Sequence, residues 1–383
     1  MIERRAGVKL SRIILAITIL ILLSNISNAQ WTLGISTDQE YNSNPFRSPL
    51  PTPSMISSYD FGLENDLSIF AIGYYGSFIS LSAVPDRNFY WHQVAAWKEF
   101  ENSSLGIFFE QRLNKELYSY FDYNNLTAYY RSQFNIGDLY FSIYPNVSLT
   151  TYNNISILDN IKGSIGANFN HGFETETTVI LGGTFNYKKY LNPSEESSIT
   201  YIDELNNSVT ETFTDKNISS ISQLVSYIRV AQSLAEKTGI AAQFTNRSIT
   251  NGFADQIKEL NMVYGDESEI FDDPVNYEGN NISVELTQIL FDDLTFKAGY
   301  YFNKKSYPSQ GVYDELSLYD TEIMRTDTQS IFSIFLNKNF PLDSSENVGI
   351  NVGLNFQSIN NKSNSYWFNY NTNSINLSLS LEF

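Results

Sequence analysis

The chain of 383 residues contains no cysteine, which excludes a disulfide, a thiol nucleophile and a cysteine-ligated metal. It has only two histidines, His92 and His171, and no G-x-S-x-G pattern, phosphate loop or histidine cluster. Basic residues are scarce: 24 Lys and Arg stand against 42 Asp and Glu, which argues against nucleic-acid binding. After the first 29 residues no uninterrupted run of about 18 apolar residues occurs, which excludes membrane-spanning helices.

Residues 1–29 have the three parts of a secretory signal peptide. Four basic residues precede an apolar run over 13–23, and Ser27-Asn28-Ala29 supplies small residues at the cleavage position. The apolar run is shorter than the roughly 20 residues that a spanning helix needs. We therefore predict export and a mature domain over 30–383. Without the leader, which carries one acidic residue, the net charge of −18 becomes about −21.

The end of the chain alternates apolar and polar residues without interruption from Ser374 to Phe383. Side chains on a strand point to opposite faces with a period of two. Leu377, Leu379, Leu381 and Phe383 therefore share an apolar face, and the serines between them share a polar one. This pattern resembles the closing strand of bacterial outer-membrane β-barrels. That resemblance implies delivery to the barrel-assembly machinery through a C-terminal strand ending in Phe.

Alternating stretches recur every 12–20 residues between 31 and 383, with turn residues between them. Short connections alternate with longer ones, which is typical of a membrane barrel with periplasmic turns and extracellular loops. We predict an all-β, transmembrane, antiparallel up-and-down barrel of about sixteen strands. Strand numbers from fourteen to eighteen are the alternatives. A secreted β-sandwich or solenoid is the alternative, but neither explains the terminal Phe.

The first hairpin offers a second, shorter resemblance. Tyr41-Asn42-Ser43-Asn44-Pro45-Phe46-Arg47-Ser48-Pro49, followed by 57–65, is similar to the opening of β-barrel porins linked to exopolysaccharide export. The resemblance covers about 35 residues. It implies passage of a hydrophilic solute, glycan included, and it assigns no functional residue.

A barrel of sixteen strands encloses a lumen too wide for side chains alone to fill. Charged residues in the polar phase of the strands are candidates for lining this lumen: Glu110, Arg112, Arg131, Lys162, Lys188, Arg229, Glu285 and Lys297. Basic residues predominate there, and rings of cations favour anions in a pore. The alternative is that these charges pair with lumen carboxylates and brace the wall. Arg112 and Arg131 lie on neighbouring predicted strands, where they could form one side of a constriction.

Tyrosine and tryptophan residues near the predicted strand ends suggest interfacial girdles, since amphipathic rings favour the headgroup level. The candidates are Tyr74, Tyr75, Tyr90, Trp91, Trp97, Tyr129, Tyr130, Tyr187, Tyr190, Tyr300, Tyr301, Tyr366 and Trp367. Nine of the ten prolines fall in predicted loops or turns. Pro145 alone falls inside a strand, where we expect a bulge because proline removes a ladder donor.

The longest predicted loops, 191–216 and 251–280, are acidic. They lack the ligand spacing of an EF-hand, so we predict solvated surface loops and no metal or cofactor. Residues 254–261 read as two helical turns that fold inward or cap the mouth. A barrel enzyme would need a positioned histidine base. We expect His92 to be a girdle or lumen-wall residue and His171 to lie in a turn, so we predict no enzyme.

These observations predict an outer-membrane channel for small hydrophilic solutes, passive or substrate-selective. The alternative is a plugged barrel that acts in binding, secretion or export through its acidic loops. The expected surroundings are outer-membrane lipid and lipopolysaccharide, while the oligomeric state stays open.

Overall fold

The protein is a closed antiparallel β-barrel of 16 strands. The computed structural model describes residues 30–192, 196–202, 208–214, 220–252, 273–291, 294–341 and 349–382. The barrel strands follow the chain in the order β1 (Gln30–Asn42), β2 (Ser54–Asp66), β3 (Ala71–Leu81), β4 (Phe89–Phe100), β5 (Ser103–Asn114), β6 (Tyr123–Ile136), β7 (Leu139–Tyr152), β8 (Asn160–Gly172), β9 (Thr177–Tyr190), β12 (Ile221–Ala235), β13 (Thr238–Asn251), β14 (Glu278–Ile289), β15 (Thr295–Tyr307), β18 (Arg325–Pro341), β19 (Gly349–Ser363) and β20 (Tyr370–Glu382). The predicted signal peptide, residues 1–29, lies outside the described residues.

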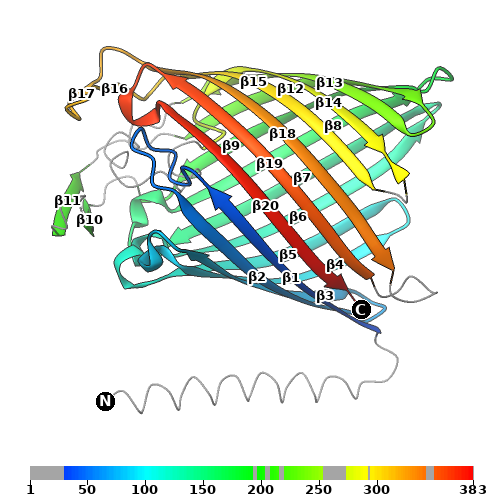
Figure 1. Ribbon diagram of the computed structural model, residues 1–383, viewed down its shortest axis with the longest axis horizontal. Coiled ribbons are helices and arrows are strands. Elements are labelled where there is room, and N and C mark those ends of the chain that lie inside the picture. The colour runs from blue at the N-terminus through cyan, green and yellow to red at the C-terminus, as the bar shows by residue number, and fades with distance from the viewer. Residues whose placement is uncertain are drawn as a thin grey trace, which may run out of the picture.

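The barrel closes between the first and last strands. β1 pairs antiparallel with β20 over nine Cα partners, from Gly34↔Glu382 to Asn42↔Ser374. Figure 1 shows β1 beside β20, so segments at opposite ends of the sequence are adjacent in space. Closure pairs every strand on both sides, which is what removes exposed sheet edges. The predicted closing strand is therefore confirmed, although its last residue, Phe383, lies outside the described residues.

The two faces of the wall have opposite chemistry. Ile375, Leu377 and Leu379 of β20 are 47%, 44% and 41% exposed, and Leu381 shares their phase. Large exposed hydrophobic residues recur in one phase of neighbouring strands, among them Phe109, Leu126 and Phe185. The alternate phase carries Ser, Thr, Asn, Gly and charged residues. Such a band of apolar side chains on the outside is the arrangement that a lipid environment requires.

Connections at the two ends of the barrel differ in length. Both described chain ends and the short turns lie at one end, here called the turn end; the opposite end, with the long connections, is the loop end (Figure 1). At the loop end are short 3-10 helices and two extra hairpins, β10 (Glu196–Ile202) with β11 (Ser208–Thr214) and β16 (Val312–Tyr313) with β17 (Tyr319–Asp320). No helix of the described residues has the length and apolar character of a membrane span.

Inward-facing tyrosines cover glycines on neighbouring strands. Tyr75 is the cross-strand partner of Gly62, and Tyr129 is the partner of Gly106. A Cβ on Gly106 would lie 2.7 Å from the Tyr129 ring, so the ring occupies the space that a side chain would need. The same pairing recurs at Gly166 with Tyr144 and at Gly182 with Tyr227. Glycine in a strand leaves the backbone uncovered, and an aromatic neighbour restores the packing.

The most deeply buried hydrophobic side chains lie under the loops. Fully buried hydrophobic residues gather at the loop end, among them Leu81, Phe121, Ile155, Ile221 and Tyr307. Arg87 is also buried there, with its guanidinium 4.8 Å from the centre of the Phe46 ring and 5.1 Å from that of Tyr118. The loops are thus packed against the strand ends.

Pro145 does not cause the predicted bulge. The β6–β7 ladder is interrupted between Tyr129↔Asn146 and Ser132↔Ile143, and the register is the same on both sides. On its other side Pro145 pairs with Ile165 of β8. Proline lacks a backbone N–H donor, and the β6–β7 ladder responds by omitting two residue pairs. No extra residue is inserted into either strand.

Candidate functional site

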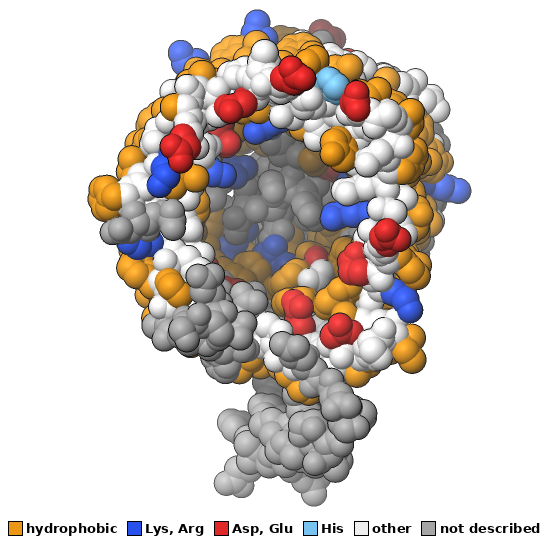
Figure 2. All heavy atoms as spheres, turned by 90° about the vertical axis from the view of Figure 1, so that its right-hand side faces the viewer, with side chains coloured by type: hydrophobic (Ala, Val, Ile, Leu, Met, Phe, Trp, Pro, Cys, Tyr) orange, Lys and Arg blue, Asp and Glu red, His pale blue; other side chains and the backbone are white. Residues whose placement is uncertain are grey.

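The inner face of the barrel divides into two sectors of opposite charge. Four adjacent strands, β20, β1, β2 and β3, contain no lysine or arginine. The inward phase of β1 and β2 instead carries Asp38, Glu40, Asp60 and Glu64. We call the inner face of these four strands the acidic sector. Figure 2, which looks into the turn end, shows the hollow barrel with lysine and arginine side chains inside the opening.

The inward cations lie on the remaining strands, the basic sector. Strand register puts all of the predicted lining residues in the inward phase: Glu110 and Arg112 on β5, Arg131 on β6, Lys162 on β8, Lys188 on β9, Arg229 on β12, Glu285 on β14 and Lys297 on β15. Their part in selecting a solute remains a proposal. Separated charges of this kind create a field across a lumen.

Arg112 and Arg131 do not form one side of a constriction. Arg112 is the partner of Tyr123 near the loop end, whereas Arg131 is the partner of Ser104 near the turn end. Tyr123 and Arg131 are eight residues apart on β6, which corresponds to about 27 Å along a strand. Arg112 stacks on Phe89, with its guanidinium 3.8 Å from the ring centre. The two arginines therefore act at different depths.

Lys188 is held by a buried ion pair. Its Nζ donates a hydrogen bond to Asp273 Oδ2 at 2.5 Å, and the side chains are only 12% and 6% exposed. Lys188 is also the direct cross-strand partner of Lys162, so the carboxylate of Asp273 offsets repulsion between two cations. Burial alone would raise the pKa of Asp273, but the ion pair with Lys188 holds it below its usual value. At Lys188, the bracing alternative is the one observed.

Asp273 begins a stretch of five residues, 273–277, that lies against the inner wall at the loop end. Gln223 on β12 donates to the carbonyl oxygens of Pro274 and Tyr277 at 2.6 and 2.8 Å. The Tyr277 ring lies 4.8 Å from Lys305 Nζ and 5.5 Å from the Arg247 guanidinium. This stretch, here called the pinned segment, thus covers several cations of the basic sector.

Arg325 is another buried cation at the loop end, besides Arg87 and Lys188. It is 3% exposed and donates to both carboxylate oxygens of Asp327, at 3.1 and 2.5 Å, and to Gln310 Oε1 at 3.0 Å. Its guanidinium lies 3.9 Å from the centre of the Tyr307 ring and 3.3 Å from that of Phe368. Because its donors are occupied, Arg325 joins the β15–β18 connection to the wall.

The two histidines do not face the lumen in a catalytic arrangement. His92 is the partner of Gly76, in the outward phase, and its Nδ1 lies 2.9 Å from the Tyr74 hydroxyl. His171 is the penultimate residue of β8, with Nδ1 3.2 Å from the carbonyl oxygen of Asp138 and its ring against Phe173. His92 is therefore a girdle residue, one of the two predicted positions, and His171 lies at the turn end.

Six of the predicted girdle residues point inward instead. In the phase of the polar residues lie Tyr75, Trp91, Trp97, Tyr129, Tyr190 and Tyr301. Proximity to a strand end suggested the girdle, but the period-two phase decides the face. The same phase rule would have found the overlooked inward charges Asp38, Glu40, Asp60, Glu64, Arg247, Lys305 and Arg325.

Among the described residues no group of three or more histidine, cysteine or acidic side chains is placed to hold a metal ion. Parts of the first acidic loop and most of the second, including the predicted helical turns at 254–261, lie outside the described residues. Within the first loop the described part forms the β10–β11 hairpin, which we had not predicted.

No protein-family model and no curated sequence matches the chain. Solved structures match over almost its whole length. OccAB1 of Acinetobacter baumannii has a TM-score of 0.53 at 7% identity, covering 94% of this chain and 97% of that one. OccAB3 of the same organism has a TM-score of 0.52 at 10% identity, covering 94% and 100%. OpdK of Pseudomonas aeruginosa, solved with vanillate, has a TM-score of 0.50 at 8% identity, covering 93% and 98%. At such identities the likeness is one of fold, and the chain has the 16-stranded fold of outer-membrane porins.

Proposed function

We propose that the chain is an outer-membrane channel for small hydrophilic solutes. The observation that carries this proposal is the closed 16-stranded wall, apolar outside and polar inside, with charges of opposite sign on facing sectors. A lumen of this strand number is too wide to be packed by side chains and holds water. The turn end would face the periplasm and the loop end the exterior, since both described chain ends lie at the turn end.

Selectivity would come from the field between the two sectors. Arg112, Arg131, Lys162 and Arg229 lie at different positions along the basic sector, and the acidic sector carries only carboxylates. A polar solute in the lumen would be oriented with its negative end toward the basic sector. This arrangement favours dipolar or charged solutes over neutral ones. The porin-fold neighbours are consistent with a channel.

Planar-bilayer recording on the refolded mature chain tests this function. We expect stepwise conductance, with a reversal potential in a salt gradient that reports the balance of the two sectors. The same detergent buffer without protein is the control for detergent artefacts. A bilayer that stays silent at high protein concentration would contradict the channel and favour a plugged barrel that acts through partner binding.

A further inference from the structure

The acidic sector contains a recess in the lumen wall. It has a volume of about 470 Å³, lies over the inner faces of β20, β1, β2 and β3, and extends onto the neighbouring strand β4. Cavities of this size accommodate small organic molecules. We infer that this recess binds the ammonium or guanidinium end of a small solute in transit, an inference that rests on the proposed channel function.

The floor of the recess is made of residues without large side chains. Gly34 and Gly62 are direct cross-strand partners, and Ser36, Ser77 and Ser380 continue the floor. A Cβ built on Gly34 meets no atom within 4 Å, so the space above it is open. The neighbouring aromatic ring of Tyr75 lies over Gly62, where a Cβ would be 3.3 Å from it. The recess therefore exists because Gly34 is left uncovered.

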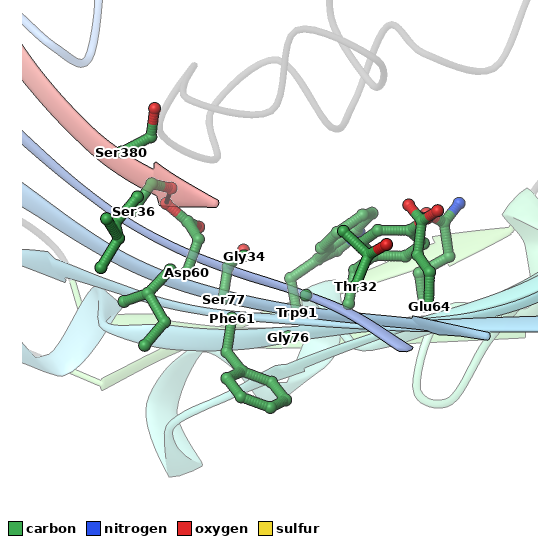
Figure 3. A pocket seen from close by; sticks show the side chains of 15 residues that line it. Thr32, Gly34, Ser36, Asp60, Phe61, Glu64, Gly76, Ser77, Trp91 and Ser380 are labelled. Carbon is green, nitrogen blue, oxygen red and sulfur yellow. Dashed lines mark hydrogen bonds between the residues drawn. The ribbon is translucent and has the colours of Figure 1, made fainter. Parts of the chain in front are cut away.

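Two carboxylates stand at opposite ends of this floor. Asp60 and Glu64 are in the same phase of β2, with Gly62 between them, which separates them by about 13 Å along the strand. Figure 3 shows Asp60 beside Ser36 at one end and Glu64 beside Thr32 at the other. Phe61, between them in sequence, points away from the recess.

Hydroxyl groups, not cations, hold these carboxylates. Ser36 and Ser58 donate to Asp60 at 3.1 and 3.0 Å, and the Tyr75 hydroxyl donates to Glu64 Oε1 at 2.5 Å. Within the part of the chain that the structure describes, the ion pairs Lys188–Asp273 and Arg325–Asp327 involve neither carboxylate. Hydroxyl donors orient a carboxylate but leave its charge uncompensated. A cation in the recess would supply the missing charge.

Aromatic rings complete the site. Tyr75 and Trp91 line the recess and point inward from β3 and β4. Ring faces attract ammonium and guanidinium groups, tryptophan most strongly. Carboxylates, lining rings and an open floor together therefore favour an organic cation over an inorganic ion, because an inorganic ion has no apolar part to pack against the rings and the floor. They also favour it over an anion, which Asp60 and Glu64 would repel.

The test compares n-butylguanidinium with n-butylurea, which has nearly the same shape but no charge. Equilibrium binding to the refolded mature chain in detergent is measured by calorimetry, so the test does not depend on conductance. We expect butylguanidinium to bind at least tenfold more tightly than butylurea. We also expect butylguanidinium to block single-channel current when it is added to the side of the bilayer from which the recess is reached.

Two substitutions separate charge from shape. Asp60→Asn keeps the volume and should weaken butylguanidinium binding about tenfold, while Gly34→Leu keeps the charge and should abolish binding by filling the floor. Glu285→Gln, an inward carboxylate on β14 in the basic sector, is the matched control and should leave binding unchanged. Gly34→Ala serves if the leucine variant does not fold.

Equal binding of the two probes, or an equal loss in Asp60→Asn and Glu285→Gln, would overturn the recess as a cation site. These results would leave the channel proposal intact if conductance is still seen. Conversely, a silent bilayer together with the expected binding pattern would overturn the proposed channel function and support the recess as a cation-binding site.

Discussion

Charged side chains on the barrel wall have different partners in the acidic sector and at the pinned segment. At the pinned segment, Lys188 has a buried carboxylate partner, and Arg247 and Lys305 lie against the Tyr277 ring. In the recess, the partners of Asp60 and Glu64 among the described residues are hydroxyl groups, and both carboxylates stay partly exposed. Both sets come from the same alternating pattern. What differs is whether a loop folds back over the wall, so pairing rather than placement decides which charges are available to a solute.

The largest effect is expected from breaking the ion pair of the pinned segment. Asp273→Asn leaves Lys188 buried without a counter-charge, which costs on the order of 3 kcal/mol, or roughly 100-fold in the equilibrium for local opening. Limited proteolysis at the loop end should accelerate accordingly, while the barrel stays folded. The double variant Lys188→Met with Asp273→Leu replaces both charges and should be cleaved much more slowly. Unchanged proteolysis in Asp273→Asn would show that the pair does not hold the segment.

Acid should release the same segment, and the direction follows from the lowered pKa of Asp273. A carboxyl whose folded-state pKa lies below its ordinary value of 3.8 contributes stability above that value. That stability is lost as the pH falls from about 3.8 through the folded-state pKa. Proteolytic protection with an acid-tolerant protease should therefore persist at pH 5 and decline only below pH 4. Release near pH 6 would contradict the assignment.

A smaller change is expected from removing one inward cation of the basic sector. Arg229→Gln should reduce the ratio of anion to cation permeability a few-fold, because the arginine contributes to the field without closing the lumen. The reversal potential in a KCl gradient measures this ratio. Lys189→Gln, an outward-facing substitution on β9, is the control and should leave the ratio unchanged. Equal shifts in both variants would mean that surface charge, not lumen charge, sets selectivity.

The smallest effect is expected at His92. His92→Ala removes a hydrogen bond to Tyr74 on the outer face, so the free energy of unfolding should fall by about 1 kcal/mol or less. Conductance should not change, because the side chain does not face the lumen. Lipid and peptide hydrolysis assays on the same preparation should give background values for both proteins. Loss of a measurable hydrolytic activity in the variant would reopen the enzyme alternative.

The period-two pattern was sufficient to find the 16 barrel strands and their faces, but not the β10–β11 hairpin at the loop end. Leu377 and Leu379 point outward and Arg229 points inward because a strand has two faces, and a barrel needs one of them apolar. The same rule predicted closure by the last strand and sixteen strands. It failed where another criterion replaced phase: Trp91 was assigned to a girdle because it lies near a strand end, yet its phase is inward.

The sequence by itself determined which side chains face lipid and which face the lumen, because alternation is a local property of an extended backbone. Only the tertiary structure decided that Lys188 meets Asp273, that Arg112 and Arg131 act at different depths, and that Gly34 opens a recess between two carboxylates. These relations depend on strand stagger around the closed barrel and on the return path of a long loop. Both are set by packing between residues far apart in the chain, which no local pattern encodes.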